Sequence, residues 1–198
     1  KKVILSTGAS TFKDISKALK VLKLKKKFLT IMHCNSSYPT PLEDVNLNVL
    51  KVMKKKYKCD VGYSDHTLSL AVPLGSVAIG ATIIEKHFTL NRLDGGVDST
   101  FSIEPQEMKI LVSETENTWQ SLGKKSYGPT EAEKPSLKFR RSLYVAKDIE
   151  INQKFTKENL RIIRPGNGLE PKYYNKVLGR KVNKKLKKGT AVKWDYLQ

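Results

Sequence analysis

Short apolar runs alternate with longer amphipathic stretches over residues 1–122. The apolar runs are rich in β-branched residues and are predicted to be strands, whereas the longer stretches repeat apolar positions with a helical period. In the stretch 11–24, for example, Ile15, Ala18, Leu19 and Leu22 share one face. The pattern predicts strands at 3–6, 28–34, 60–63 and 82–88, and helices at 11–24, 45–56, 70–79 and 105–122.

Four consecutive strand–helix units imply parallel strands joined by right-handed crossovers, in either a doubly wound sheet or a (β/α)8 barrel. Chemically capable side chains follow all four strands, and active sites of such barrels lie at the carboxyl ends of the strands. We therefore expect an α/β fold that forms the carboxyl-terminal half of a TIM barrel. Because the chain starts at Lys1 almost within a strand, we also expect it to be incomplete, with the other four units upstream.

A turn-rich connector with two glycines and a proline separates this region from a smaller one of about 60 residues. The smaller region has short elements and frequent turns, with strands predicted at 142–146 and 160–163, a helical turn at 157–160 and a tight loop at 164–168. We expect a mainly β module. The predicted organisation is a barrel domain at 1–123, a linker at 124–137 and a small domain at 138–198.

Charge is concentrated in the last third of the chain. The whole sequence has 37 Lys and Arg against 19 Asp and Glu, a net charge of +18, and residues 134–198 alone hold 18 against 5. A basic excess suggests a polyanionic partner, but most of these lysines lie on polar faces, so we expect a solvated surface and no nucleic-acid partner. Apolar runs are too short for a membrane span, and two cysteines without CxxC spacing favour the cytoplasm.

Two histidines, His66 and His87, are the sharpest chemical signal. Each follows a predicted strand, and adjacent barrel strands would bring both imidazoles within reach of one ion. Two imidazoles with water and substrate oxygens suit Mn²⁺, or alternatively Mg²⁺ or Co²⁺, better than a structural zinc. The alternative is that each ring is an interior residue hydrogen-bonded to Asp65 or Glu85, and spacing alone leaves both interpretations open. His33 is expected to belong to the core.

Hydroxyl and amide side chains also gather at the predicted strand ends, where they could hold a phosphate or a carboxylate together with backbone N–H groups. Serine and threonine are common where loops start in any protein, so this pattern alone favours an ordinary loop. The candidates are Ser6, Asn35, Ser36 and Ser64.

Several motifs give these residues a more specific interpretation. The motifs ILSTG (4–8), HCNSSYPTPLEDVNL (33–47), GYSDHT (62–67) and IEKHFTL (84–90) resemble those of the sialic acid, or nonulosonic acid, synthase family in order and spacing. The motifs RRSL (140–143), FTKENL (155–160) and RPGNG (164–168) resemble that family's carboxyl-terminal SAF, or antifreeze-like, domain. The resemblance covers essentially the whole chain.

The resemblance implies a transferase that condenses phosphoenolpyruvate with an N-acylated hexose and releases phosphate and a nine-carbon acid. It implies that His66 and His87 bind a divalent ion, that Tyr38 and Asp98 lie near the reacting sugar, and that Ser6 and Ser64 contact phosphoenolpyruvate. Relatives have an Asn two residues before the Tyr, where this chain has Ser36, with Asn35 alongside. Whether Ser36 or Asn35 makes the substrate contact of that Asn is left open.

The resemblance also implies a homodimer in which the SAF domain is exchanged. Arg164 matches an arginine that reaches the partner's barrel to meet the N-acyl group of the sugar. The loop GGVDSTFSIEP (95–105) and the segment LEPKYY (169–174) are similar to the pseudaminic acid synthase versions. We expect the protein to be a pseudaminic acid synthase, with N-acetylneuraminate synthase as the alternative.

Two other functions are compatible with the residues alone. A basic SAF-type module without enzymatic activity could bind an anionic glycan or nucleic acid, although the lysine runs lack the interleaved aromatic residues that stack on single strands. The second of these functions is that of a different metal-dependent barrel enzyme, such as an aldolase. Upstream sequence would distinguish them, since the synthase family should have a glutamate at the end of the first barrel strand.

Overall fold

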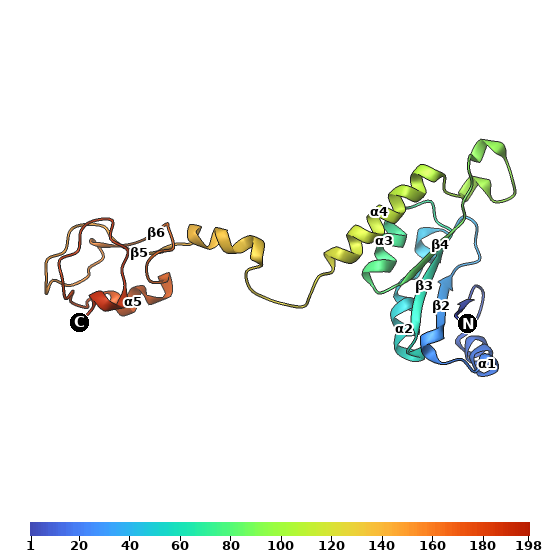
Figure 1. Ribbon diagram of the computed structural model, residues 1–198, viewed down its shortest axis with the longest axis horizontal. Coiled ribbons are helices and arrows are strands. Elements are labelled where there is room, and N and C mark those ends of the chain that lie inside the picture. Colours follow the sequence, from blue (N-terminus) through green and yellow to red (C-terminus); the bar gives the residue numbers. More distant parts are fainter. The chain divides into compact units, whose positions relative to one another are not determined.

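The structure is a computed structural model that describes residues 1–198. The chain forms two compact units, Lys1–Lys125 and Ser126–Gln198, which are described separately below. Figure 1 shows the helices and strands of each. None of the helices is both long enough and apolar enough to cross a bilayer.

The first unit is built on a four-stranded parallel sheet in the order β1-β2-β3-β4. Each strand lies next to the one that precedes it in the sequence, with no reversal of order, which is the arrangement of a barrel rather than of a doubly wound sheet. The predicted fold class, half of a (β/α)8 barrel, is therefore confirmed. The strands are β1 (Val3–Ser6), β2 (Leu29–Cys34), β3 (Asp60–Asp65) and β4 (Ile83–Lys86); the helices are α1 (Phe12–Leu22), α2 (Asn48–Tyr57), α3 (Ala71–Ala78) and α4 (Pro105–Ser121).

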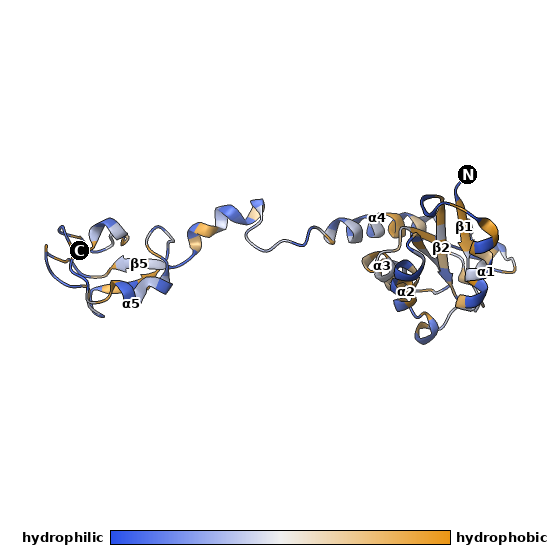
Figure 2. Cartoon of the chain, turned by 90° about the horizontal axis from the view of Figure 1, so that it is seen from below, coloured by the Kyte–Doolittle hydropathy of each residue, from blue (hydrophilic) through white to orange (hydrophobic).

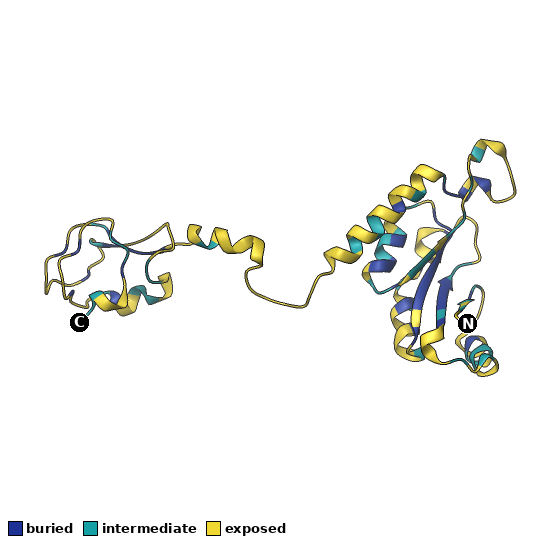
Figure 3. Cartoon of the chain, viewed as in Figure 1, coloured by how far each residue is buried: buried dark blue, intermediate teal, exposed yellow.

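The core of this unit lies between the sheet and its helices. Ile31 and Val61 pair in register across β2 and β3, and both are fully buried, as are Leu50 of α2 and Tyr63 of β3. Figure 2 shows the strands in the hydrophobic colours, and Figure 3 shows that buried residues gather on β2 and β3. A strand with helices over its face needs nearly continuous apolar residues, which is the pattern seen in the sequence.

Local chemistry sets where the helices begin and end. Thr11 and Asp14 form a reciprocal capping box at the start of α1, and Lys23 ends the helix in a left-handed conformation. Helix α2 begins at Asn48, later than the predicted residue 45, because Asn46 has a positive φ of 50° that a helix cannot include. Strand β4 is shorter than the predicted 82–88, although Phe88 makes an isolated bridge with Ile103.

The second unit has its own core around a two-stranded antiparallel sheet. Strands β5 (Ser142–Val145) and β6 (Leu160–Ile163) pair, and further isolated bridges and the short helix α5 (Tyr174–Val177) surround them. The expected helical turn at 157–160 is present as a single α-turn: the Leu160 N–H donates to the Thr156 carbonyl at 3.1 Å, and Thr156 and Asn159 hydrogen-bond to each other's backbone. Residues Glu131–Phe139 form a 3-10 helix that is almost wholly exposed and extends two residues beyond the expected linker.

Candidate active site

The two histidines lie together at the carboxyl edge of the sheet. His66 directly follows β3 and His87 directly follows β4, and these strands are hydrogen-bonded neighbours. Their ring centroids are 5.1 Å apart and the ring planes are inclined by 67°. Two imidazoles that share an ion place their ligating nitrogens at most about 4.2 Å apart. The separation of the rings is compatible with that arrangement.

A neighbouring carbonyl sets the donor nitrogen of His66. Its Nδ1 lies 2.7 Å from the carbonyl oxygen of Asn35, which can only accept, so Nδ1 must carry a proton. The Ser64 hydroxyl donates its one proton to Glu85 Oε1 at 2.6 Å, and its oxygen lies 3.4 Å from Nε2. In the neutral ring with its proton on Nδ1, the lone pair is on Nε2. A backbone carbonyl on the other ring nitrogen is the usual support of a metal-binding histidine.

His87 is paired with a carboxylate from the following loop. Its Nδ1 lies 3.4 Å from Asp98 Oδ2, and the side chains are 31% and 53% exposed respectively. Asp98 is held in place by Ser102, whose backbone N–H and hydroxyl both donate to the Asp98 carbonyl. The contact brings the sequence-predicted Asp98 next to the histidines.

Aromatic rings line the same edge. The Tyr38 ring centroid is 4.4 Å from that of His66 and 5.7 Å from that of His87, and the Tyr38 side chain remains half exposed. Phe101, which is buried, contacts both Tyr38 and His87 at 5.5 and 5.0 Å between centroids. The sequence interpretation missed Phe101, although it belongs to the loop that carries Asp98.

Asn35 connects the ends of β2 and β3. Its side-chain nitrogen donates to the Asp44 carbonyl at 2.7 Å, and its own carbonyl accepts from His66. The Asn35 Oδ1 atom is buried and has no hydrogen-bond partner. Buried polar atoms are nearly always paired, so this acceptor is available to a donor from a bound molecule.

The other predicted side chains are more scattered. Ser6 and Ser36 are exposed, and no hydrogen bond joins either of them to the histidines. Ser36 packs against Gly8, where a Cβ atom would lie 2.3 Å from the Ser36 hydroxyl, so a larger residue at position 8 would require the Ser36 side chain to move. Arg164 belongs to the second unit, directly after β6, and its side chain is exposed.

The alternative interpretation of the histidines named the wrong partners. Neither Asp65 nor Glu85 contacts His66 or His87 through a hydrogen bond; their place is taken by the Asn35 carbonyl and Asp98. His33 does belong to the core, where its Nε2 lies 2.8 Å from the Val45 carbonyl and burial lowers its pKa.

The residues present fit an open metal site better than a closed one. No group of three or more His, Cys, Asp or Glu side chains surrounds a single point. The protein offers two imidazoles instead, one of them with its lone pair on Nε2 as described above. Such a pair is suited to a divalent ion that takes its remaining ligands from water and substrate.

Comparison with known proteins agrees with this geometry. The NeuB family model matches residues 1–127 and the SAF domain model matches residues 140–198. The pseudaminic acid synthase of Campylobacter jejuni is 38% identical over 98% of this chain and 57% of its own length. The N,N'-diacetyllegionaminic acid synthase of the same species is 37% identical over 98% of this chain and 59% of its own.

A solved structure shows the same relationship. The N-acetylneuraminic acid synthetase of Leptospira borgpetersenii is 40% identical, with a TM-score of 0.63, over 70% of this chain and 49% of its own length. The chain thus spans less than two thirds of the proteins it resembles. The family match covers the whole first unit, with its four strands, its paired histidines and their aromatic neighbours, and the chain belongs to the NeuB family and has an SAF domain.

Proposed function

We propose that the protein condenses phosphoenolpyruvate with an N-acylated hexose to form a nine-carbon nonulosonic acid and phosphate. The pairing of His66 with His87 beneath Tyr38, in a chain of the NeuB family, carries this proposal. In the reaction, C3 of phosphoenolpyruvate bonds to the aldehyde carbon of the sugar. Water adds at C2 and the phosphate group leaves, so no oxidant or second cofactor is required.

The histidines would hold a divalent ion, for which Mn²⁺ is our first choice and Mg²⁺ or Co²⁺ the others. When bound, such an ion supplies Lewis-acid polarisation of a carbonyl oxygen. The chain itself fixes the His66 tautomer through Asn35, so that the ring presents a lone pair rather than a proton at the carboxyl edge of the sheet.

Neighbouring side chains would bind and orient the two substrates. Tyr38 presents a half-exposed ring beside both histidines, where it can cover one face of the sugar and exclude water. Asp98 is an exposed acceptor for a sugar hydroxyl.

The serine and asparagine groups suit the charged ends of phosphoenolpyruvate. Ser6 and Ser36 are exposed, so their hydroxyls are free to donate to a phosphate or carboxylate. Ser64 already donates to Glu85, so it would need to release that bond to meet the substrate. The Asn35 Oδ1 acceptor would require a donor group, such as a sugar hydroxyl or a bound water.

Among the sugars, we favour the pseudaminic acid precursor, because the loop 95–105 and the segment 169–174 are similar to those of pseudaminic acid synthases. The likeness to an N-acetylneuraminic acid synthetase keeps N-acetylmannosamine as the second candidate. Arg164 would contact the N-acyl group from a partner subunit of a homodimer, as the resemblance implies. The two cysteines are free, as a cytoplasmic enzyme requires.

An assay of phosphate release from phosphoenolpyruvate tests the reaction. The full-length protein should release phosphate when it is given the pseudaminic acid precursor, more slowly or not at all with N-acetylmannosamine, and only when Mn²⁺, Mg²⁺ or Co²⁺ is present. The opposite sugar preference would select the second candidate. No release with either sugar would contradict the proposed function.

The variants His66→Ala and His87→Ala test the shared site. Each should abolish metal-dependent turnover, and the double variant should be no worse than either single one, because loss of one ligand already removes the ion's function. Additive effects on the activation free energy, or activity that survives chelation, would contradict a shared ion. Circular dichroism of each variant serves as the control for folding.

A further inference from the structure

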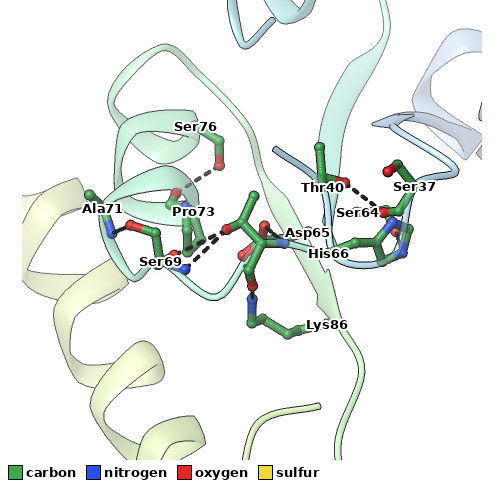
Figure 4. Close-up of polar contacts among 11 residues, drawn as sticks. Ser37, Thr40, Ser64, Asp65, His66, Ser69, Ala71, Pro73, Ser76 and Lys86 are labelled. Carbon is green, nitrogen blue, oxygen red and sulfur yellow. Dashed lines mark hydrogen bonds and ion pairs between the residues drawn. The ribbon is translucent and has the colours of Figure 1, made fainter. Parts of the chain in front are cut away.

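A buried ion pair joins the two residues that directly precede the histidines in the sequence. Asp65 is the last residue of β3 and Lys86 the last of β4, and the two are partners in the parallel register. Lys86 Nζ is 2.7 Å from Asp65 Oδ2, and the side chains are 5% and 0% exposed. Figure 4 shows Lys86 reaching toward Asp65. Because successive strand residues point to opposite faces of a sheet, the side chains of Asp65 and Lys86 lie on the other face from those of Ser64 and Glu85.

The ion pair also closes a ring around the backbone of His66. The Thr67 N–H donates to Asp65 Oδ1 at 2.9 Å, and Lys86 donates to the Thr67 carbonyl as well. The residues before and after His66 are therefore held by the same ammonium group. The His66 carbonyl accepts from the Thr40 N–H at 3.0 Å, so this turn is fixed from both sides.

Stability alone is a weak reason for such a pair. Lys86 lines a mostly apolar cavity of about 140 Å³ between the β3–α3 loop and α4, whose other walls include Leu68, Pro73 and Leu111. Removing two charges from water is costly, and replacing a buried ion pair by apolar side chains of similar size is often neutral or stabilising. What the pair provides and apolar side chains do not is a fixed, directional link between the ends of β3 and β4.

We propose that Asp65 and Lys86 are positioning residues for His66 and His87. They hold the ends of the two strands in one register and keep the His66 turn closed, so that the ring stays hydrogen-bonded to the Asn35 carbonyl and both imidazoles face one ion. This inference rests on the proposed metal-binding role of the histidines. It assigns no chemical step to Asp65 or Lys86, neither of which contacts the reacting atoms.

The double variant Asp65→Leu/Lys86→Met in the full-length protein separates positioning from stability. Without metal, long-range ¹H–¹⁵N NMR should show the His66 proton on Nδ1 in the wild type and a mixture of tautomers in the variant. With metal, the Mn²⁺ affinity measured by electron paramagnetic resonance should fall about tenfold or more. The midpoint of urea unfolding should change little, because the substitution leaves no unpaired buried charge.

A matched control removes an ion pair elsewhere. Lys134 pairs with Glu131 on an exposed helix at 2.7 Å, and Lys134→Met should leave both the tautomer and the Mn²⁺ affinity as in the wild type. If the double variant does not fold, the variant Asp65→Asn/Lys86→Met gives the same two readouts, since the new asparagine keeps an acceptor for the Thr67 N–H and no unpaired buried charge is left.

The outcomes separate this inference from the function on which it rests. A folded variant that keeps the Nδ1 tautomer and the wild-type Mn²⁺ affinity overturns the positioning role. A folded variant that loses the Nδ1 tautomer supports the positioning role, whether or not the wild type binds Mn²⁺. Absence of Mn²⁺ binding by the wild type would contradict the metal site of the proposed function.

Discussion

His33 and His66 are both buried histidines near the carboxyl edge of the sheet, and their surroundings give them different roles. His33 donates to the Val45 carbonyl and packs against Tyr63 inside the core. His66 donates to the Asn35 carbonyl and packs against the half-exposed ring of Tyr38. Burial alone does not distinguish the two rings. The neighbours of each ring, Tyr63 in the core for His33 and the half-exposed Tyr38 with His87 for His66, distinguish them.

The buried His33 predicts how stability depends on pH. Burial lowers the pKa of His33 below its ordinary value of 6.5, with the Val45 hydrogen bond opposing the shift. Below pH 6.5 the unfolded chain therefore binds a proton that the folded chain resists. The free energy of unfolding therefore falls as the pH drops below 6.5. Above that pH, His33 is neutral in both states and causes no such loss. Urea unfolding from pH 8 to 5 should show this loss, and His33→Gln should reduce it; an unchanged slope would contradict the assignment.

Residue order along the chain could identify only part of the site. His66 and His87 are predicted because each follows a strand in a repeated strand–helix unit, and their proximity in space follows from parallel packing. Tyr38 and Asp98 are expected because the resemblance to the sialic acid synthase family implies them, and both lie beside the histidines. The bond from Ser64 to Glu85 and the Asp65–Lys86 pair depend instead on the register between β3 and β4. That register is not visible in local sequence. The chemical roles of all these residues stay predictions.

At the scale of elements, the β4–α4 loop is held to the start of helix α4 by one arginine. The Arg92 backbone N–H and side chain bond to Glu104 and to the Ser102 carbonyl at 2.9 Å each, and its guanidinium also pairs with Glu107. Glu104 and Glu107 form the capping box of α4. The loop that carries Asp98 is thus continuous with a stable helix end.

This clamp predicts a loop-specific effect of Arg92→Ala. The ion pairs are partly exposed, so global stability should fall by no more than about 1 kcal/mol. Hydrogen exchange of residues 89–103 should nevertheless become faster, because the loop loses the guanidinium bonds to Ser102 and Glu107 and keeps only the backbone bond to Glu104. Lys109→Ala, an exposed position of the same helix without an ion pair, is the control. Equal protection of the loop in both variants would show that Arg92 does not hold it.

Element boundaries show where local sequence is insufficient. Hydrophobic period located all four strands and helices of the first unit, because amphipathic faces must pack on the sheet. It extended helix α2 three residues too early, since nothing in the apolar pattern reports the left-handed backbone of Asn46. In the second unit the helical turn predicted at 157–160 is present as one α-turn, which does not continue because strand β6 begins at Leu160.

At the scale of the whole molecule, the chain has two separate hydrophobic cores. The second unit buries nine apolar residues of its own, including Phe155, Leu160 and Val182, and none of them belongs to the core of the first unit. A core of this kind allows a small region to fold as a cooperative unit. The two units should therefore respond separately to substitutions.

Substitution of Phe155 tests this separation. Phe155 is 1% exposed, and Phe155→Ala should destabilise the second unit by about 3 to 5 kcal/mol through lost burial and a residual cavity. Ile151→Ala, at a 58% exposed apolar residue of the same unit, should have little effect. Hydrogen exchange should become faster across residues 126–198 and stay unchanged in β1–β4. Equal loss of protection in both units would show that they unfold together.

The proposed function of the second unit rests on Arg164. If its guanidinium contacts the N-acyl group of the sugar, Arg164→Ala should lose a charge-assisted hydrogen bond worth roughly 1.5 to 3 kcal/mol. Use of the sugar should then fall about tenfold or more, whereas the apparent affinity for phosphoenolpyruvate should change little. A loss that is equal for both substrates in steady-state kinetics would point to a structural role instead. Arg161→Ala, on β6 and also exposed, is the matched control.

A mixing experiment tests whether Arg164 acts across a dimer. An Arg164→Ala subunit retains the histidines, and a His66→Ala subunit retains the arginine. If each site combines the barrel of one subunit with Arg164 of its partner, a mixed dimer has both lesions in one site and leaves the other site intact. Activity should then rise above that of either variant alone, to at most half of the wild-type value for each mixed dimer. Differently tagged subunits would show by affinity capture that exchange has occurred. Mixed dimers that remain inactive after demonstrated exchange would mean that Arg164 serves its own subunit, or none.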